Sequence, residues 1–530
     1  MVPKNCLPSL PAEVWTLAWN MVCCRQDLKS LVLTCRLFRF ICQELLFKEV
    51  RFSSTPHSTL LLLMLEFVTS ENPASMRSEW QGHIERGARR IEGLSHHPVH
   101  RYSVKTVWFD GMENLDMSVR SFPQEQAFEI QQTLMSSYLL ALKSFTNLRH
   151  VGLGSSVIVN DELAHALSNL PNMDELLMHG PCSTSIASPM IAVKALTLSD
   201  VPSRSQDGVS GLELCSSQRM TSLTLHGIRH PEILLYHELA QREVNFLTHM
   251  VLHVRTTQLT AVFYFLPSCR NLESIGLYPS SDNGHIPLKL PSLPADPMPR
   301  LSSFSGPVNL AHSIIPGRPV IDIEIVGLHQ RDPSDFPYDW DVETLDNAIL
   351  RPLVKSLVPI RRFHMALMPL SGTMLEVICQ YFPQLHSLEL GFDYRATHKI
   401  VMTDEDRQLM TFFGTNGCDP THPNSYLDEY ETRDPDPLKV ILKDICYGRA
   451  HLPKRLASLR ISYLCEAGHQ VWTIAEEGTM VLTLSKLYPA LQFIAFGIGD
   501  SVGIRHWVRN EGDHGGRLQW KPSFASATPI

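Results

Sequence analysis

The sequence predicts an α/β protein in which an N-terminal three-helix module is followed by a solenoid of parallel βα units. Three observations support this fold class. Apolar residues recur at helical spacing three times near the start of the chain. A short pattern, apolar-x-x-apolar-x-apolar, then returns along most of the remaining sequence. The helix-like segments between its copies end at prolines, which favour an extended chain just before the next copy.

The N-terminal module consists of three segments with apolar residues at positions i, i+3, i+4 and i+7. These residues are Val14, Leu17, Ala18 and Met21, then Leu28, Leu31, Val32 and Cys35, then Phe38, Ile41, Cys42 and Leu45. The spacing places one apolar stripe on each predicted helix. Three stripes in so short a segment enclose a core that is too small to be stable alone, so we expect the module to dock onto a neighbour.

This stretch resembles an F-box, and the fungal versions most closely. The residues that match the family pattern are Leu10, Pro11, Glu13, Asp27, Leu28, Leu31, Cys35 and Arg36, and Phe38 stands where the family often has Trp. Two positions depart from it: Ala18 replaces a larger aliphatic residue and Thr34 replaces a Val, and both would weaken the contact with a partner. A helical cap on a larger domain is the alternative interpretation.

The resemblance implies that the chain docks onto a Skp-type adaptor of a cullin-RING ubiquitin ligase and recognises an unknown protein substrate. The docking residues would be Leu10, Pro11, Val14, Leu28, Leu31 and Cys35, with Phe38 packing the module. This interpretation requires Leu28 and Leu31 to lie on the surface of the module. Other subunits of such a ligase transfer ubiquitin, so we expect this chain not to be an enzyme.

The repeated pattern follows the module at intervals of about 20 to 30 residues in its early copies, as in leucine-rich repeats. Clear copies are Leu148–Leu153, Val193–Leu198, Met220–Leu225, Leu247–Leu252, Leu272–Leu277, Val320–Ile325, Ile360–Met365, Leu385–Leu390, Leu456–Ile461 and Leu491–Phe496, with weaker copies at Met173–Met178 and Leu301–Gly306. In each copy the last two apolar residues lie on one face of a short strand, and the residue between them faces the other way.

The segments between copies are typical of helices. Examples are Asp161–Leu170, Gln258–Leu266, Thr373–Phe382 and Thr479–Tyr488, and a proline follows each of them. Helix, proline and strand in succession predict stacked units that cover one another's apolar faces. The array resembles the irregular leucine-rich-repeat domains that follow fungal F-boxes, although the Asn that normally follows the strand is not regular here.

We expect an F-box-like module at residues 1–51, a helical adaptor at 52–100, an irregular leucine-rich-repeat-like solenoid at 101–504 and a C-terminal tail at 505–530. Val104–Phe109 would be a first, capping strand of the solenoid. Two segments, near 331–341 and 393–453, have too few periodic apolar residues to be repeats. We expect both to be loops inserted on one face.

Composition restricts the function classes. The net charge of −8 argues against a nucleic-acid partner. The 12 cysteines form no Cys-x-x-Cys, and neither an Asn-x-Ser/Thr acceptor nor a signal-peptide pattern occurs, so we expect a cytoplasmic and/or nuclear protein that is not secreted. The longest apolar run, Leu60–Leu65, is far shorter than the roughly 20 residues of a membrane span, so we expect no membrane partner.

No enzyme motif stands out. A Gly-x-Ser-x-Gly elbow and a Walker loop are absent, and Gly497–Gly503 resembles a dinucleotide loop only loosely. His96, His97 and His100 are poor metal ligands, because adjacent residues of an extended chain point to opposite sides. We therefore expect no catalytic residue, cofactor or metal. Two alternatives remain: an F-box-like scaffold without a ligase role, and a hydrolase or transferase whose site forms only in space.

Candidate target-binding residues come from the outward strand positions and from the first inserted loop. They are His249, His253, Glu324, Arg362, His364, Glu389 and Arg460 on strands, and Phe336, Tyr338 and Trp340 in the loop. Charged and His side chains suit a protein epitope better than an apolar small molecule, and exposed aromatic residues are typical of binding hot spots. A solvated face without a ligand is the alternative.

Overall fold

The protein is described by a computed structural model. It describes residues 15, 18–19, 25–53, 73–110, 124–154, 157–179, 182–184, 190–199, 212, 214–226, 246–254, 259–279, 293, 298–326, 349–366, 372–393, 437–464, 474–498, 505–510 and 519–524. The chain divides into two compact units, residues 1–253 (unit 1) and 254–530 (unit 2). Each unit is described by itself below.

Unit 1 begins with the helical module. Helix α2 (Arg25–Val32) and helix α3 (Arg36–Lys48) are joined by a short turn, and α3 runs directly into strand β1 (Glu49–Ser53). Cys35 is the N-cap of α3, and its Sγ accepts the backbone N–H of Phe38 at 3.4 Å. This cap satisfies one of the N–H groups that the first helical turn leaves without a partner.

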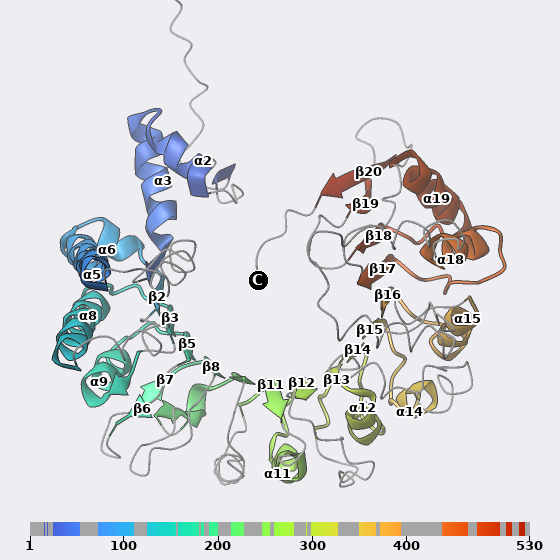
Figure 1. Ribbon diagram of the computed structural model, residues 1–530. Coiled ribbons are helices and arrows are strands. Elements are labelled where there is room, and N and C mark those ends of the chain that lie inside the picture. Colours follow the sequence, from blue (N-terminus) through green and yellow to red (C-terminus); the bar gives the residue numbers. More distant parts are fainter. Residues whose placement is uncertain are drawn as a thin grey trace, which may run out of the picture. The chain divides into compact units, whose positions relative to one another are not determined.

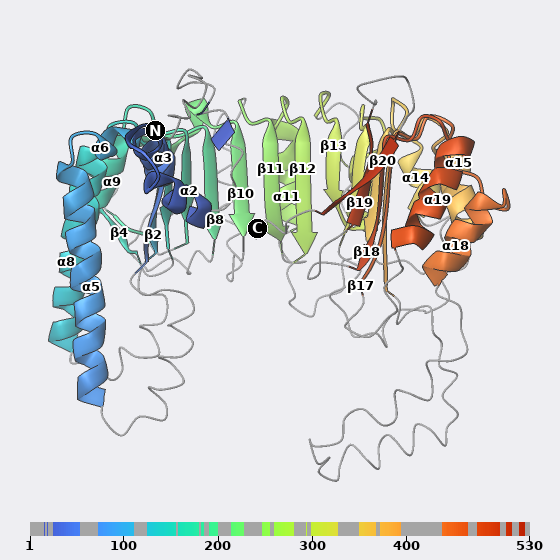
Figure 2. The same ribbon diagram turned by 90° about the horizontal axis from the view of Figure 1, so that it is seen from above.

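The strands of unit 1 pair in parallel, each with the next one in the sequence apart from two short side pairs (Figures 1 and 2). Their order is β1, β2 (Thr106–Asp110), β3 (His150–Leu153), β5 (Glu175–Met178), β8 (Ala195–Ser199), β10 (Ser222–His226) and β11 (His249–Val254). The side pairs are β4 (Val159–Asn160) with β6 (Cys182–Ser183) and β7 (Ile191–Ala192) with β9 (Cys215–Ser216).

Apart from α2 and α3, the helices of unit 1 lie together on one side of these strands (Figure 1). They are α5 (Pro73–His96), α6 (His100–Ser103), α8 (Gln124–Ser144) and α9 (Asp161–Ser168), with a 3₁₀ turn at η2 (Ser217–Arg219). Asn160 caps α9 by accepting the N–H of Leu163 at 2.9 Å. We call the opposite side of the strands the open face of the unit.

Unit 2 repeats this construction. Its parallel strands are β12 (Ser274–Pro279), β13 (Ser303–Gly306), β14 (Asp322–Ile325), β15 (Arg362–Ala366), β16 (Ser387–Asp393), β17 (Ser458–Leu464) and β18 (Phe493–Ile498), in that order. Strands β19 (Arg505–Asn510) and β20 (Gln519–Phe524) follow in antiparallel orientation. The unit therefore ends in antiparallel pairing.

The helices of unit 2 also share one side of the strands, opposite an open face (Figure 1). They are α11 (Leu259–Phe265) with the 3₁₀ turn η4 (Leu266–Ser268), α12 (Val308–Ile314), α14 (Arg351–Leu353), α15 (Gly372–Tyr381), α18 (Pro437–Cys446) and α19 (Ile474–Leu487). Within the described ranges, no helix combines the length and apolar character that a membrane crossing requires.

The repeated sequence pattern forms the core of both units. All twelve copies provide a strand, and every hydrophobic residue of the pattern is at most 6% exposed. Strand β10 illustrates this alternation of inward and outward side chains. Leu223 and Leu225 are fully buried, whereas Thr224 between them faces the other way and is half-buried. The α/β class is therefore confirmed, with predominantly parallel strands.

Three predicted boundaries are wrong. Residues Glu49–Ser53 pair with β2, so a strand precedes the segment that was expected to cap the array. The C-terminal tail contains β19 and β20. The second predicted loop includes the end of β16 and all of α18, whose amphipathic pattern was overlooked. The rest of that loop up to residue 436, and the loop at 331–341, lie outside the described residues.

Candidate functional site

Leu28 is a core residue of the helical module. It is 8% exposed and packs in a cluster with Trp19, Ile41 and Cys42. Phe38 closes this cluster, with its ring 4.2 Å from that of Trp19, which confirms its predicted packing role. The assignment of Leu28 to a docking surface is therefore wrong, because its side chain completes the module's own core.

The remaining predicted docking residues differ in their surroundings. Leu31 is half-buried against the same cluster, and the exposed Cys35 serves as the cap of α3. Leu10, Pro11 and Val14 lie outside the described residues. The module thus presents less of the predicted surface than the sequence pattern suggested.

Other apolar side chains of the module are exposed. Leu33, Leu37 and Phe40 are 80%, 44% and 64% exposed. Leu37 and Phe40 lie three residues apart on α3 and therefore share a face, and Leu33 precedes them in the turn. We call these three residues the exposed apolar row. Sequence reasoning missed them because it followed one stripe per helix and did not ask what the surplus apolar residues would cover.

The other end of α3 packs within unit 1. Helix α3 contacts α6 and β1, and the ring of Phe47 lies 4.2 Å from that of His100. The neighbour that the small core requires is thus partly provided by the chain itself. The exposed apolar row lies at the opposite end of the helix.

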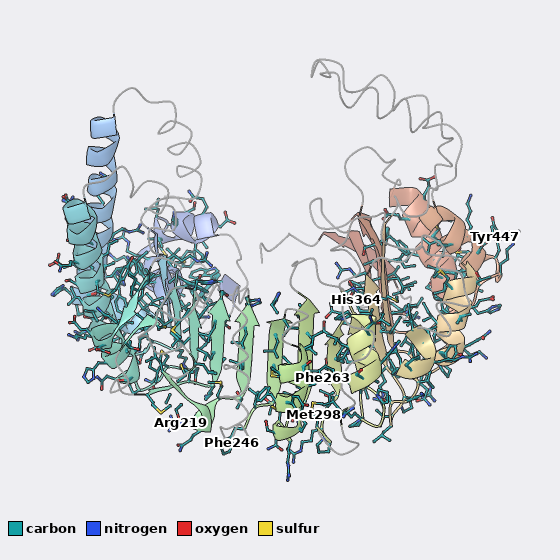
Figure 3. The ribbon with its side chains drawn as sticks, turned by 60° about the horizontal axis from the view of Figure 1, so that its bottom comes forward. Arg219, Phe246, Phe263, Met298, His364 and Tyr447 are labelled. Carbon is teal, nitrogen blue, oxygen red and sulfur yellow. The ribbon has the colours of Figure 1, made fainter. Side chains whose placement is uncertain are left out.

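On the open face of unit 2, five polar residues occupy opposing positions on successive strands. We call them the polar ladder: Ser305, Glu324, His364, Glu389 and Arg460. The Ser305 hydroxyl donates to Glu324 at 2.7 Å, His364 Nδ1 lies 3.1 Å from Glu324, and Arg460 Nη1 lies 3.2 Å from Glu389. The middle member of the ladder, His364, is labelled in Figure 3. The structure therefore brings together four residues that the sequence nominated separately.

The ladder extends at its edges. Tyr278 shares a hydrogen bond with Ser305 at 2.9 Å, and Arg362 forms an ion pair with Asp322 at 2.5 Å in the neighbouring row. His364 Nε2 also lies 3.9 Å from Glu389. Asp322, Glu324, Arg362, His364, Glu389 and Arg460 on this face thus each have an opposite charge beside them when His364 is protonated.

Two pKa shifts follow from this arrangement. Burial alone would lower the pKa of His364, but its hydrogen bond to Glu324 and the charge of Glu389 outweigh burial, so the pKa lies above 6.5. The hydrogen bond from His364 holds the pKa of Glu324 below its usual value, with a further contribution from Ser305. Both shifts favour the charged pair.

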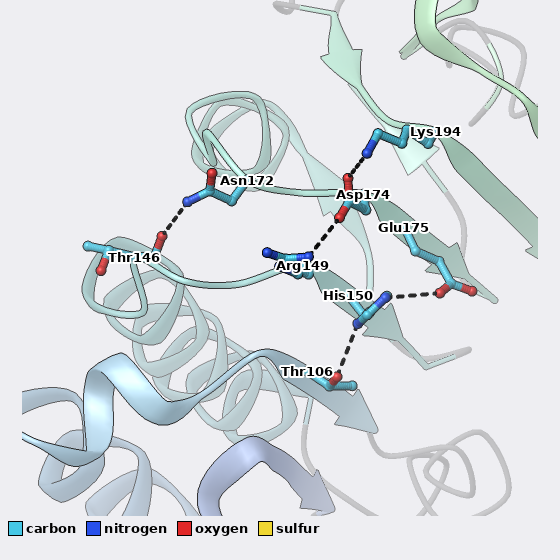
Figure 4. Close-up of polar contacts among 8 residues, drawn as sticks. All are labelled: Thr106, Thr146, Arg149, His150, Asn172, Asp174, Glu175 and Lys194. Atoms are coloured by element: carbon cyan, nitrogen blue, oxygen red, sulfur yellow. Dashed lines mark hydrogen bonds and ion pairs between the residues drawn. The ribbon is translucent and has the colours of Figure 1, made fainter. Parts of the chain in front are cut away.

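On the open face of unit 1 the charges are less well matched. The residues that immediately precede the strands form a row through backbone hydrogen bonds: Lys48, Lys105, Arg149, Asp174, Lys194, Thr221 and Thr248. Asp174 lies 2.7 Å from Lys194 and 3.9 Å from Arg149 (Figure 4). The hydrogen bond from Lys194 is the main reason that the pKa of Asp174 is lowered.

The first row of outward strand residues lies beside the row of residues that precede the strands. His150 is 3.7 Å from Glu175 on one side and 3.2 Å from the Thr106 hydroxyl on the other (Figure 4). In the next row, the Arg51 guanidinium lies 5.3 Å from the centre of the Trp108 ring, a cation–π contact. The Trp108 ring in turn occupies the space that a side chain at Gly152 would need.

His249 and His253 belong to β11 of unit 1, whereas the ladder residues belong to unit 2. The ring of His253 lies 4.4 Å from that of His226, and burial together with this neighbour lowers its pKa. His249 hydrogen-bonds to the Thr248 hydroxyl at 2.8 Å. Both histidines thus make these contacts within unit 1.

The three loop aromatics, Phe336, Tyr338 and Trp340, lie outside the described residues. At the histidine cluster, His97 Nδ1 accepts the backbone N–H groups of Val99 and His100 at the start of α6. Among the described residues, no three His, Cys, Asp or Glu side chains are grouped as a metal ion requires. Comparisons with protein families and with curated proteins find no match for this chain.

Proposed function

We propose that the chain is a non-enzymatic substrate-recognition adaptor of a Skp–cullin–F-box type ubiquitin ligase. In this proposal the helical module binds a Skp-type adaptor through a surface other than the predicted one, because Leu28 is buried in the module's own core, and the open faces hold a protein target. The observation that carries the proposal is the exposed apolar row, Leu33, Leu37 and Phe40, on a module whose own core is already closed. An apolar row on a small helical module is the kind of surface that a partner covers.

We also propose that both units are irregular leucine-rich-repeat-like solenoids. Parallel pairing in sequence order supports this within each unit, as does the burial of three pattern positions in every copy. Helices on a single side of the strands leave the other side available, and such faces are the binding surfaces of repeat proteins.

The test is co-purification of the full chain with a recombinant Skp-type adaptor. Wild type binds, and Leu33→Asp or Phe40→Asp lowers the affinity at least about tenfold, because each places a charge in an apolar contact. Lys29→Asp, at an exposed position of α2, is the matched control and retains binding. If circular dichroism shows that the wild-type chain is folded and it still does not bind the Skp-type adaptor, the ligase assignment is contradicted.

A second function is favoured by one observation. Ala18 and Thr34 are both exposed, and the Thr34 hydroxyl donates to the carbonyl of Leu31 at 2.8 Å beside the exposed apolar row. A polar group at this place weakens an apolar contact, which suits a scaffold that has an F-box-like module but no ligase role. If Thr34→Val greatly strengthens binding of the Skp-type adaptor while wild type recruits no cullin, the scaffold function is supported.

A further inference from the structure

The edge at which the strands of unit 1 begin carries a set of cations that are far apart in the sequence. Lys48, Lys105, Arg149 and Lys194 precede β1, β2, β3 and β8, and all four are exposed. We call them the basic edge. Neighbouring strands lie about 4.8 Å apart, so the four residues span roughly 19 Å along the edge.

Two of these cations lack a partner in the described part of the chain. Arg149 and Lys194 share Asp174, whereas no described carboxylate oxygen lies within 4.0 Å of Lys48 or Lys105. Glu49, the carboxylate next to Lys48 in sequence, pairs with Arg51 at 3.2 Å instead. Positive charge is therefore left over at the beginning of this edge.

The excess extends over the adjacent rows. The edge row and the first two outward rows of unit 1 contain five Lys or Arg side chains and three carboxylates. The corresponding rows of unit 2 contain three Lys or Arg side chains and four carboxylates. This excess stands out in a chain of net charge −8.

A partly exposed row with little charge lies three residues further along the strands than the basic edge. It contains Trp108, Leu177, Thr197, Thr224 and Val251, with Arg51 at its end. Three strand residues cover about 10 Å, so a peptide that lies between the two rows can reach the cations with one side chain and this row with the next. Cations beside an apolar row suit an acidic chain that also carries apolar side chains.

We propose that the basic edge of unit 1 binds an extended, acidic segment of the target protein. The proposal rests on the recognition role proposed above and specifies the chemistry of its target. An extended chain advances about 3.3 Å per residue, so a segment of about six residues spans the edge. Its carboxylates meet Lys48 and Lys105, where no ion pair between described residues has to be broken.

The probe for the test is a fluorescent 12-residue peptide with alternating Glu and Leu, measured by polarisation against the purified full chain. We expect binding that weakens steeply between low and physiological salt. A peptide with Gln in place of Glu binds at least about tenfold more weakly. The Skp-type adaptor is not included, so failure here leaves the docking proposal untouched, and failure of docking leaves this one untouched.

Variants locate the site. The double substitution Lys48→Gln with Lys105→Gln lowers the affinity at least about tenfold, and the corresponding double Arg variant restores it. Lys143→Gln, at an exposed position of α8 on the helical side of the same unit, is the matched control and changes nothing. The proposal would be overturned if the Gln double variant bound the Glu peptide as tightly as Lys143→Gln does. It would also be overturned if the wild-type chain bound the Gln peptide as tightly as the Glu peptide, or a single-stranded RNA more tightly than the Glu peptide.

Discussion

On the open face of unit 2 neighbouring strands exchange opposite charges, whereas in unit 1 Lys48 and Lys105 have no such partner among the described residues. Both faces are built from the same backbone pattern. The difference is that the ladder residues already satisfy one another, so a ligand has to break existing contacts before it can form new ones. A row of charged side chains is thus a better candidate for a binding site where some of its charges have no ion-pair partner than where its charges are numerous but already paired.

The largest expected effect comes from removing one member of the ladder. Glu389→Gln leaves Arg460 facing a neutral amide, and the buried Nε of Arg460 already has no hydrogen-bond partner among the described residues. We expect a loss of about 1 to 3 kcal/mol in the free energy of unfolding, measured by urea denaturation. The matched variant in unit 1, Glu175→Gln, changes it by less than about 0.5 kcal/mol, because Glu175 is more exposed and 3.7 Å from His150. Equal effects would remove the distinction between the faces.

Two glycines sharpen the comparison through packing. A Cβ at Gly306 in unit 2 would lie 2.8 Å from the backbone oxygen of Leu277, and a Cβ at Gly152 in unit 1 would lie 2.1 Å from the ring of Trp108. We expect each Ala substitution to cost about 1 to 2 kcal/mol. Adding Trp108→Leu recovers most of the loss at Gly152, because a side chain can yield, and a double-mutant cycle measures this recovery. No side-chain substitution should relieve Gly306→Ala in this way, because the nearest atom there is a backbone oxygen. If a second side-chain substitution fully restored the stability of Gly306→Ala, this explanation of the two glycines would be wrong.

The ladder also makes unit 2 sensitive to pH. The pKa of His364 is raised in the folded state, so its stabilisation is fully present below about 6.5 and is lost as pH rises through the folded pKa. The pKa of Glu324 is lowered, so its stabilisation is present above about 4.5 and is lost as pH falls through the folded pKa. We therefore expect a fall in the urea midpoint from pH 6 to pH 8 that His364→Gln reduces. An unchanged slope in that variant would show that the ladder is not the titrating element.

The smallest expected effect on stability is at the basic edge. Lys48→Gln with Lys105→Gln removes two exposed charges that form no ion pair among the described residues, so the free energy of unfolding changes by less than about 0.5 kcal/mol. The same protein sample loses affinity for the acidic peptide. A large loss of stability would mean that these lysines serve the fold instead of a ligand.

The strands were predictable because each copy of the pattern fixes three buried positions, as in Leu385, Leu388 and Leu390, which are at most 3% exposed. Strand β1 was missed because Glu49–Ser53 continues a helix without a preceding proline. Strands β19 and β20 carry no copy of the pattern at all. Periodicity therefore predicts the repeated part of the chain and not the elements that close its ends.

The candidate sites were less predictable because they depend on register and burial. His364 and Glu389 were nominated from outward positions, but their mutual pairing required the alignment of β15 with β16. A signal for the basic edge existed: Lys105, Arg149 and Lys194 all follow the first apolar residue of a copy. In the module, a family pattern gave no indication that Leu28 faces inward, since an apolar residue suits a core as well as an interface.

The most direct test of the proposed adaptor role is hydrogen exchange of the full chain with and without a Skp-type adaptor. We predict slower exchange in the turn and first half of α3, residues 33–40, and no change in the strands of either unit. Unchanged exchange at residues 33–40, or protection confined to the open faces, would contradict the role assigned to the helical module.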